Sequence, residues 1–290
     1  MKKITRKWIT AALAAAAAVS LTACGSGANT QESEAGSSEP VVVKVGVVGE
    51  YNAQWDTINE LLADDGIQVE LVKFTDYAAP NRALDDGEID LNAFQHKAFL
   101  ANDIQQKGYD IVDIGDTIIA PLGIYNNKDK ISSIEGIKDG DVIAIPSDLT
   151  NGGRALKLLE AAGLIECDPA KGVVPTKADI TKYNTQIEIM EAESATLANI
   201  LPDCAAAIIN GGNAFTAGLN PLTDTIFVED VNPETNPAVP DLVNVIVART
   251  EDKDNETYLK IVEAYHTAEV QETIEEEYQG AFVCAWEGAE

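Results

Sequence analysis

The sequence predicts an α/β protein with two lobes. Apolar, strand-like runs alternate with segments of helical spacing from about Val41 to Trp286, which is the βαβ pattern of a mostly parallel sheet. A first block of this pattern ends at Ile119 and a second begins at Val142, so a second α/β unit follows the first. The whole segment is long enough for one large or two medium domains with a hydrophobic core.

The first block begins with a valine-rich strand, and the residues after it repeat at helical spacing. Its expected elements, in order, are a strand at Val41–Val48, a helix through Trp55, Ile58, Leu61 and Leu62, a strand at Leu71–Val72, a helix at Pro80–Asp85, a strand through Leu91, a helix at Lys97–Gln106 and a strand at Ile111–Ile119.

The second block repeats the alternation, and the chain ends in two amphipathic helices. The expected elements are strands at Val142–Ile145, Ile187–Met190, Ala205–Ile209 and Leu242–Ala248, and helices at Gly152–Ala162, near Leu197, at Tyr258–Tyr265 and at Val270–Tyr278. We assign residues 41–122 and 230–290 to lobe 1 and residues 123–229 to lobe 2. Because no Gly/Ser linker separates the lobes, we expect short strands to form a hinge and both sets of strand ends to meet at one cleft.

The N-terminus has the pattern of a processed signal. Four basic residues precede an apolar run at Trp8–Leu21 that is too short to cross a bilayer comfortably. Leu21-Thr22-Ala23-Cys24 resembles the bacterial lipobox, so we expect residues 1–23 to be removed and Cys24 to be lipidated; the alternative is an ordinary signal peptide with an incidental cysteine. Two or more acyl chains anchor a protein stably, and residues 24–40 are expected to be a flexible tether outside the cytoplasm.

Acidic residues dominate the rest of the chain. After the signal, 16 basic residues face 48 acidic ones, a formal charge of −32, which argues against nucleic acid and anionic membrane surfaces as partners.

Cys167, Cys204 and Cys284 match no zinc pattern and cannot all pair. The sequence favours neither alternative, one disulfide between two of them or three buried thiols.

Lobe 2 carries a candidate carboxylate site in the segment Pro146–Arg154, between a strand and a helix. Thr150 or Asn151 is expected to cap the helix, and the glycines at 152 and 153 would let a ligand approach the backbone. The helix start offers free N–H groups, and Arg154 adds a guanidinium that matches a carboxylate in two hydrogen bonds. The alternative is a capped helix with a surface arginine.

Lobe 1 carries candidate residues for an apolar ligand side chain. Ala93–Phe99 follows a strand and opens a helix, and His96 lies there between Phe94 and Phe99. A lone histidine is more often a structural residue than a ligand group. Tyr77, in another strand-to-helix loop, offers a ring face and a hydroxyl; its alternative is a tyrosine at the edge of the core.

Asn210 follows the apolar run at Ala205–Ile209, at the carboxyl end of an expected strand. Its carboxamide can accept from an ammonium group and donate to a carboxylate, although Asn-Gly-Gly is also ordinary turn chemistry.

Dinucleotide, Walker A, zinc-protease and nucleophile-elbow motifs are absent, and the chain has only two histidines. We therefore expect no enzyme, no cofactor and no metal.

Several motifs along the mature chain together resemble the NlpA/MetQ family of methionine-binding lipoproteins of ATP-driven importers. Phe-Gln-His-Lys after Asn-Ala is the most specific of them. The matching stretches are Phe74–Tyr77 with Pro80-Asn81, Gly87–Asp90, Asn92–Lys97, Thr150-Asn151 with Gly153-Arg154, Ile209-Asn210 and Ile226–Asp230.

The resemblance implies a two-lobed periplasmic-binding-protein fold of type II, with two chain crossings and a ligand cleft between the lobes. It implies that Arg154 holds the ligand's carboxylate, that Asn210 binds its amino and carboxylate groups, and that Asn151 assists. Tyr77, Phe94 and His96 fall where the family encloses the side chain, and Phe99 stands near them. The implied partners are methionine, an ABC permease with its ATPase, and the membrane through the lipid anchor.

Three departures from the family pattern affect the expected ligand. Ala98-Phe99 replaces the usual Pro-Tyr, Leu149 stands where proline is common, and Glu193–Ala195 departs from Glu-Ala-Pro-Gln. One ring change can shift the preference for a flexible thioether. We expect capture of L-methionine, with D-methionine, another apolar amino acid or a methionine peptide as alternatives.

A surface lipoprotein acting as an adhesin or signalling partner without transport is the rival function, and a hydrolase ranks third.

Overall fold

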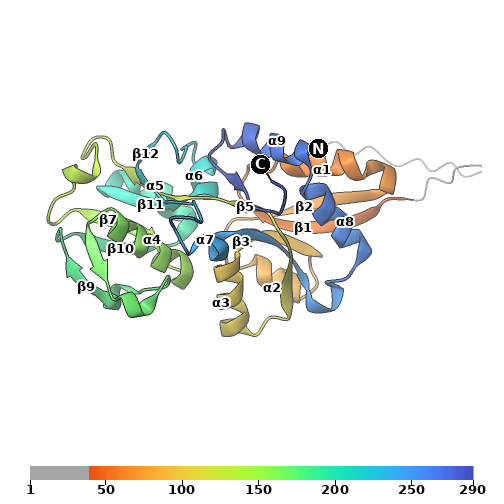
Figure 1. Cartoon of the computed structure of the whole chain (residues 1–290), viewed down its shortest axis with the longest axis horizontal. Coiled ribbons are helices and arrows are strands. Elements are labelled where there is room, and N and C mark those ends of the chain that lie inside the picture. The colour runs from red at the N-terminus through yellow and green to blue at the C-terminus, as the bar shows by residue number, and fades with distance from the viewer. Residues whose placement is uncertain (1–38, 290) are drawn as a thin grey trace, which may run out of the picture. The chain divides into compact units, whose positions relative to one another are not determined.

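Two five-stranded mixed sheets form the centres of two lobes (Figure 1). The computed structural model describes residues 39–289. The expected signal peptide, the expected lipidation site at Cys24 and nearly all of the expected tether lie outside the described residues. Within the described part of the chain, no helix combines the length and apolar character that crossing a membrane requires.

The sheet of the first lobe has the strand order β2-β1-β3-β13-β4. β1 pairs in parallel with β2 and β3, whereas β13 runs antiparallel to both β3 and β4. Because β13 comes from late in the chain, two separate segments build this lobe. The strands are β1 Val41–Val48, β2 Ile67–Phe74, β3 Leu91–His96, β4 Ile111–Asp116 and β13 Asn244–Arg249.

The sheet of the second lobe has the order β10-β7-β11-β6-β12, which repeats the first arrangement. β7 pairs in parallel with β10 and β11, and β6 runs antiparallel between β11 and β12. In each sheet the antiparallel insert is a strand that follows a crossing between the lobes. The strands are β6 Leu122–Asn126, β7 Val142–Pro146, β10 Glu188–Ala192, β11 Ala206–Asn210 and β12 Thr225–Val228.

The chain crosses between the lobes twice. The first crossing contains the short strand β5 (Ile118–Ile119), and the return from β12 passes through α7 (Val239–Leu242). The C-terminal strand β14 (Val283–Cys284) pairs antiparallel with β5. The single strand expected at Ile111–Ile119 is thus divided at Thr117, because β4 pairs with β13 while β5 pairs with β14. The residue limits of the two lobes stay a prediction.

Helices cover both faces of each sheet (Figure 1). In the first lobe α1, α8 and α9 pack on one face and α2 and α3 on the other; in the second lobe α4 and α5 lie on opposite faces. A small hairpin of β8 (Ile165–Cys167) and β9 (Ile180–Tyr183) follows α4. The remaining helices are α1 Gln54–Leu62, α2 Pro80–Asp85, α3 Lys97–Lys107, α4 Leu149–Ala161, α5 Leu197–Ile200, α6 Gly211–Thr216, α8 Glu256–Tyr265 and α9 Ala268–Glu277.

The alternation of apolar residues in strands and their spacing in helices explain why most elements could be predicted from the sequence. In β1, Val43, Val45 and Val47 are buried and pack with Trp55 and Ile58 of α1, as period-two and helical patterns require. By contrast, β6 is buried on both faces and β12 is half-buried throughout, so neither shows alternation and neither was predicted. The three cysteines at 167, 204 and 284 are free thiols.

Candidate functional site

A cleft opens between the lobes, beyond the carboxyl ends of strands from both sheets. It contains about 950 Å³ of atom-free space, part of it open to solvent. Val48 and His96 end β1 and β3 on one side, while Asn210 ends β11 on the other. Ligands of open α/β sheets bind at such strand ends. All seven residues expected to bind the ligand line this cleft: Tyr77, Phe94, His96, Phe99, Asn151, Arg154 and Asn210.

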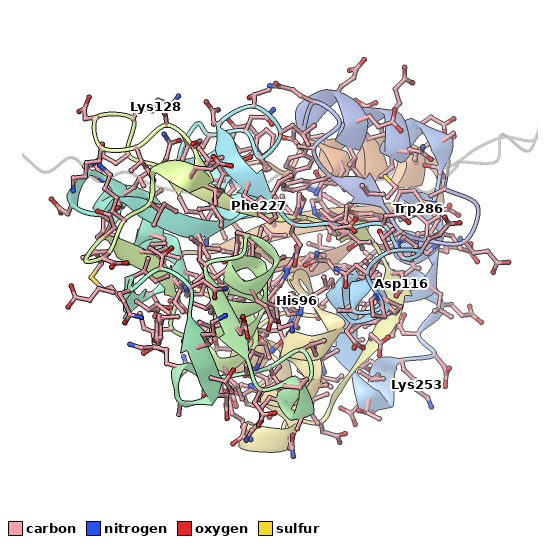
Figure 2. The ribbon with its side chains drawn as sticks, turned by 60° about the vertical axis from the view of Figure 1, so that its left-hand side comes forward. His96, Asp116, Lys128, Phe227, Lys253 and Trp286 are labelled. Atoms are coloured by element: carbon pink, nitrogen blue, oxygen red, sulfur yellow. The ribbon has the colours of Figure 1, made fainter. Side chains whose placement is uncertain are left out.

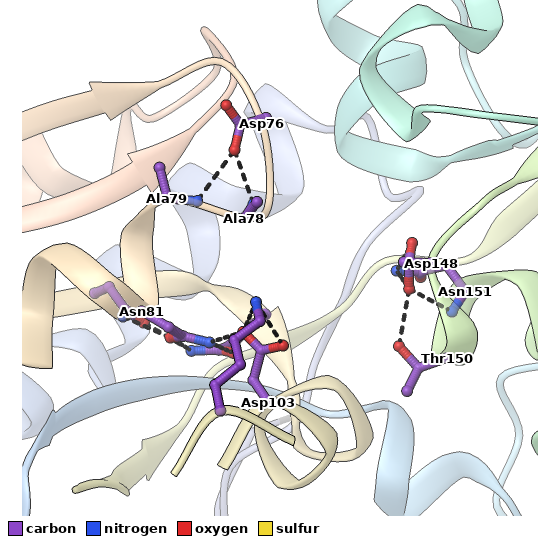
Figure 3. Close-up of polar contacts among 11 residues, drawn as sticks. Asp76, Ala78, Ala79, Asn81, Asp103, Asp148, Thr150 and Asn151 are labelled. Atoms are coloured by element: carbon purple, nitrogen blue, oxygen red, sulfur yellow. Dashed lines mark hydrogen bonds and ion pairs between the residues drawn. The ribbon is translucent and has the colours of Figure 1, made fainter. Parts of the chain in front are cut away.

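The start of α4 orients Asn151. Asp148 is the N-cap, and its Oδ1 accepts from the backbone N–H of Asn151 at 2.9 Å and from the hydroxyl of Thr150 at 3.1 Å. The expectation that Thr150 or Asn151 caps this helix is therefore wrong, because the helix begins at Leu149 and includes both residues. Asn151 Nδ2 also donates to the Asp148 carboxylate, at 3.0 and 3.1 Å (Figure 3). Asn151 Oδ1 is thereby turned away from Asp148.

Arg154, one turn further along α4, is held by both crossings. Its Nε donates to Glu229 Oε1 at 2.6 Å, its Nη2 donates to Glu229 Oε2, and Nη2 also donates to the carbonyl of Ala120 at 2.9 Å. The side chains of Arg154 and Glu229 are 7% and 9% exposed. The two-bond fork expected for a ligand carboxylate is therefore taken by Glu229. Among residues 39–289, nothing accepts a hydrogen bond from Arg154 Nη1.

His96 is a neutral link between the lobes. Its Nδ1 accepts from the backbone N–H of Phe99 at 3.1 Å, so that nitrogen carries no proton. A neutral ring then has its proton on Nε2, which lies 3.3 Å from Asn151 Oδ1 and donates to it. Burial, reinforced by the charge of Arg154, lowers the pKa of His96 to about 3. Figure 2 shows His96 near the centre of the molecule, beside the green ribbon of the second lobe.

Asn210 leaves one acceptor free toward the cleft. Its Nδ2 donates to Asn151 Oδ1 at 2.7 Å, so Asn151 accepts from both His96 and Asn210. Asn210 Oδ1 is buried and has no hydrogen-bond partner in the described part of the chain. Buried carboxamide oxygens are normally satisfied, and this one lies at a strand end that faces the cleft.

Aromatic rings form the apolar wall on the side of the first lobe. The ring centroids of Tyr77, Phe94 and Phe99 lie 5.9 to 6.1 Å apart in tilted and edge-on arrangements, and the His96 ring meets Phe99 edge-on at 6.2 Å. Burial raises the pKa of Tyr77 above its usual value, so its hydroxyl stays protonated. Such a wall suits a flexible apolar side chain.

The family model described as NlpA lipoprotein matches residues 43–286, nearly the whole described chain. The chain belongs to the NlpA lipoprotein family. This confirms the resemblance and agrees with the two-lobed architecture, because solved relatives share the fold.

Relatives within the NlpA lipoprotein family cover most of both chains. "Outer membrane lipoprotein 3" of Mannheimia haemolytica is 45% identical over 75% of this chain and 80% of its own length. "D-methionine-binding lipoprotein MetQ" of Escherichia coli K12 is 39% identical over 86% and 90%. A nutrient-binding protein from Burkholderia cenocepacia, solved bound to methionine, has a TM-score of 0.77 at 34% identity and covers 84% and 100%.

In this member of the NlpA lipoprotein family, a buried amide network supports the strand that carries Phe94 and His96. The pairing of β13 with β3 skips Phe94, which forms a bulge; bulges re-aim side chains beside binding sites. The bulge places Asn92 and Gln95 on one face. Asn81 bonds both, accepting from Asn92 Nδ2 at 3.0 Å and donating to Gln95 Oε1 at 2.7 Å (Figure 3).

Sequence reasoning missed three residues that shape this NlpA-family cleft. Glu229 lies in the quoted motif Ile226–Asp230, and Asp148 in Pro146–Arg154, but neither motif shows which side chain it will meet. Gln54 lies in the first turn of α1 and lines the cleft. Its only sequence signal was a polar residue directly before Trp55, which many surface helices share.

Proposed function

We propose that this protein is the substrate-binding lipoprotein of an ABC importer and that its cleft captures L-methionine. The observation that carries the proposal is the composition of one cleft: a guanidinium edge, an unpaired amide oxygen and a wall of aromatic rings. A carboxylate, an ammonium group and a flexible apolar side chain match these three features. The printed names of the E. coli and Burkholderia relatives support methionine as the ligand.

In this proposal the ligand's carboxylate binds Arg154 Nη1, and Asn210 Oδ1 accepts from the ammonium group. Asn151 holds Asn210 and His96 in place, and the thioether side chain lies against Tyr77 and Phe94, with Phe99 behind them. Because these contacts come from both lobes, the ligand favours the closed form over the open one, and only such a difference in affinity can drive closure. The closed form then docks on a membrane permease.

The proposed location follows from the family. Lipoprotein relatives and the sequence at Cys24 support an anchor on the outer side of the cell membrane, with the tether giving the binding lobes reach to the permease. Among the described residues that line the cleft there is no serine, cysteine, aspartate, glutamate or lysine, and both nitrogens of His96 are hydrogen-bonded to other residues. We therefore propose a binding protein and not an enzyme.

The decisive experiment is titration calorimetry with L-methionine, D-methionine and methionine dipeptides on wild type and Arg154→Ala. We expect L-methionine to bind more than tenfold more weakly to the variant, because a charge-assisted hydrogen bond is lost. Arg154→Ala also leaves Glu229 buried without its partner. The double variant Arg154→Met with Glu229→Gln removes that complication and should be equally impaired.

Arg249→Ala is the matched control. Arg249 also bridges a carboxylate and backbone carbonyls, those of Asp252, Leu84 and Ile89, but it does not line the cleft. We expect its loss to reduce stability without changing affinity. Unchanged methionine affinity in both Arg154 variants would remove Arg154 from the ligand site.

A further inference from the structure

Gln54 presents a buried acceptor that no protein group satisfies. The residue is 6% exposed and lines the cleft. Its Oε1 is buried and has no hydrogen-bond partner within residues 39–289. Unpaired buried acceptors destabilise a fold and are rare for that reason. A polar atom of this kind at the wall of a binding cleft indicates a ligand group that completes it.

The neighbouring tyrosine decides which way the Gln54 amide faces. The Tyr278 hydroxyl donates its single proton to the carbonyl of Tyr51 at 3.0 Å, so the phenolic oxygen can only accept from Gln54. Burial raises the pKa of Tyr278, and a side-chain hydrogen bond with Gln54 acts against that rise. A donor from Gln54 can only be Nε2, which agrees with Oε1 being the buried atom that has no partner.

The charges around the cleft define what Oε1 can bind. Arg154 is the single charged side chain among the described residues that line the cleft. No aspartate or glutamate lines it, and Glu229 is committed to Arg154. A ligand's ammonium group therefore has to be held by neutral oxygens. The unpaired ones on opposite sides are Gln54 Oε1, from α1 of the first lobe, and Asn210 Oδ1, from β11 of the second.

We propose that Gln54 is a specificity-determining residue whose Oε1 accepts a hydrogen bond from the ligand's amino group, opposite Asn210. The proposal rests on the proposed function, the capture of an amino acid. An ammonium group carries three N–H bonds, so it has enough donors for both oxygens. The contact thus ties the amino group to both lobes, so that recognition of the amine and closure of the cleft become one event.

The start of α1 does not oppose this role. The positive end of a helix would disfavour a cation, but Glu277 accepts the backbone N–H of Ala53 at 2.9 Å and also bonds the N–H of Asn52. This carboxylate binds the two N–H groups that directly precede α1 and so places an acidic group beside the start of the helix. The local field at Gln54 is therefore compatible with an ammonium group.

The test compares two ligands on wild type and Gln54→Met by titration calorimetry. The ligands are methionine and 4-(methylthio)butanoate, which is methionine without its amino group. We expect methionine to bind about 10- to 100-fold more weakly to the variant, since a hydrogen bond to a charged group is lost, while the affinity for 4-(methylthio)butanoate stays the same. Gln68→Met makes the same chemical change at an exposed position of β2 and should alter neither affinity.

Thermal unfolding separates a binding role from a structural one. Gln54→Met removes the unpaired Oε1 together with the Nε2 donor to Tyr278, whose hydroxyl keeps its bond to Tyr51. These two effects oppose each other, so the unliganded variant should unfold close to wild type. A wild type that binds no amino acid would overturn the proposed function. The role of Gln54 alone would be overturned if wild type binds methionine and the variant has equally reduced affinity for both ligands. It would also be overturned if the variant has unchanged affinity for both.

Discussion

At the scale of single residues, the protonation state of His96 matters most. Its Nδ1 must stay unprotonated to accept from Phe99, and its Nε2 must carry the proton to reach Asn151. A charged ring would break the first of these bonds and place a cation near Arg154. The hydrogen bonds of His96 to Phe99 and Asn151 therefore require the neutral ring, although an exposed histidine titrates near pH 6.5.

Acid should destabilise the protein partly through His96. Its folded pKa, about 3, lies below the unfolded value of about 6.5. Above pH 6.5 the ring is neutral in both states and has no effect. As the pH falls below 6.5, the unfolded chain binds a proton that the folded chain refuses, so stability declines until the pH nears 3. Between pH 7 and pH 5 we expect a loss of about 2 kcal/mol from this residue.

Urea unfolding of wild type and His96→Gln at both pH values measures this loss. His266, the other histidine, and all carboxylates are present in both proteins, so their contributions cancel in the comparison. The variant should be less stable at pH 7 but should lose less stability on acidification. Equal losses in the two proteins would contradict the assignment.

At the scale of elements, β3 places Phe94 and His96 at the cleft because hydrogen bonds among buried amide side chains hold this strand in position. Asn81, Asn92 and Gln95 are 0 to 2% exposed, and Asn81 also donates to Asp103 at 3.0 Å. A polar network with every member satisfied specifies one arrangement, whereas a partly satisfied one is costly. The network is thus expected to set the position of the aromatic wall.

Asn81→Leu should weaken both the fold and the site. It leaves Gln95 Oε1 and Asn92 Nδ2 buried without a partner, so we expect a loss of about 3 kcal/mol in the free energy of unfolding and weaker methionine binding at a temperature where the variant is still folded. Lys182→Met is the control, because both side chains of its ion pair with Glu166 are exposed; it should change stability by less than about 1 kcal/mol. Similar losses in the two variants would speak against the network.

At the scale of the whole molecule, the two lobes share side chains. Phe215 lies on α6, which follows a strand of the second sheet, yet it belongs to the core of the first lobe. Its ring meets Tyr51, Tyr278 and Phe282 edge-on at 5.3 to 5.7 Å. Together with the strand pairing of β5 and β14, this contact joins the lobes beside the hinge.

Phe215→Ala should reduce the coupling between the lobes. We expect wild type to unfold in one calorimetric transition, and the variant to lose about 3 to 4 kcal/mol and to show a broader or divided transition. Phe227→Ala is the control, since Phe227 packs within the second lobe alone. It should lower the midpoint without dividing the transition. A single sharp transition in Phe215→Ala would show that other contacts couple the lobes.

The α/β class, the restart that marks a second lobe and seven residues that line one cleft could all be predicted from the sequence. Each of these depends on local signals: side-chain period within an element, or polar residues directly after an apolar strand. Tyr77, His96 and Asn210 could be found because they follow strands, and the strand ends of each sheet converge on the edge where ligands bind. Arg154 was predicted from its place beside a helix start, and the family motifs added the assisting role of Asn151.

Tertiary structure alone decided which partners these residues meet. Arg154 and Glu229 are 75 residues apart in the chain, and nothing local to either indicates that a crossing between the lobes will bring them together. The unpaired oxygens of Gln54 and Asn210 are likewise visible only when every neighbour is in place. Local propensities act within an element, whereas hydrogen-bond satisfaction depends on all the segments that surround an atom after the chain has crossed and returned.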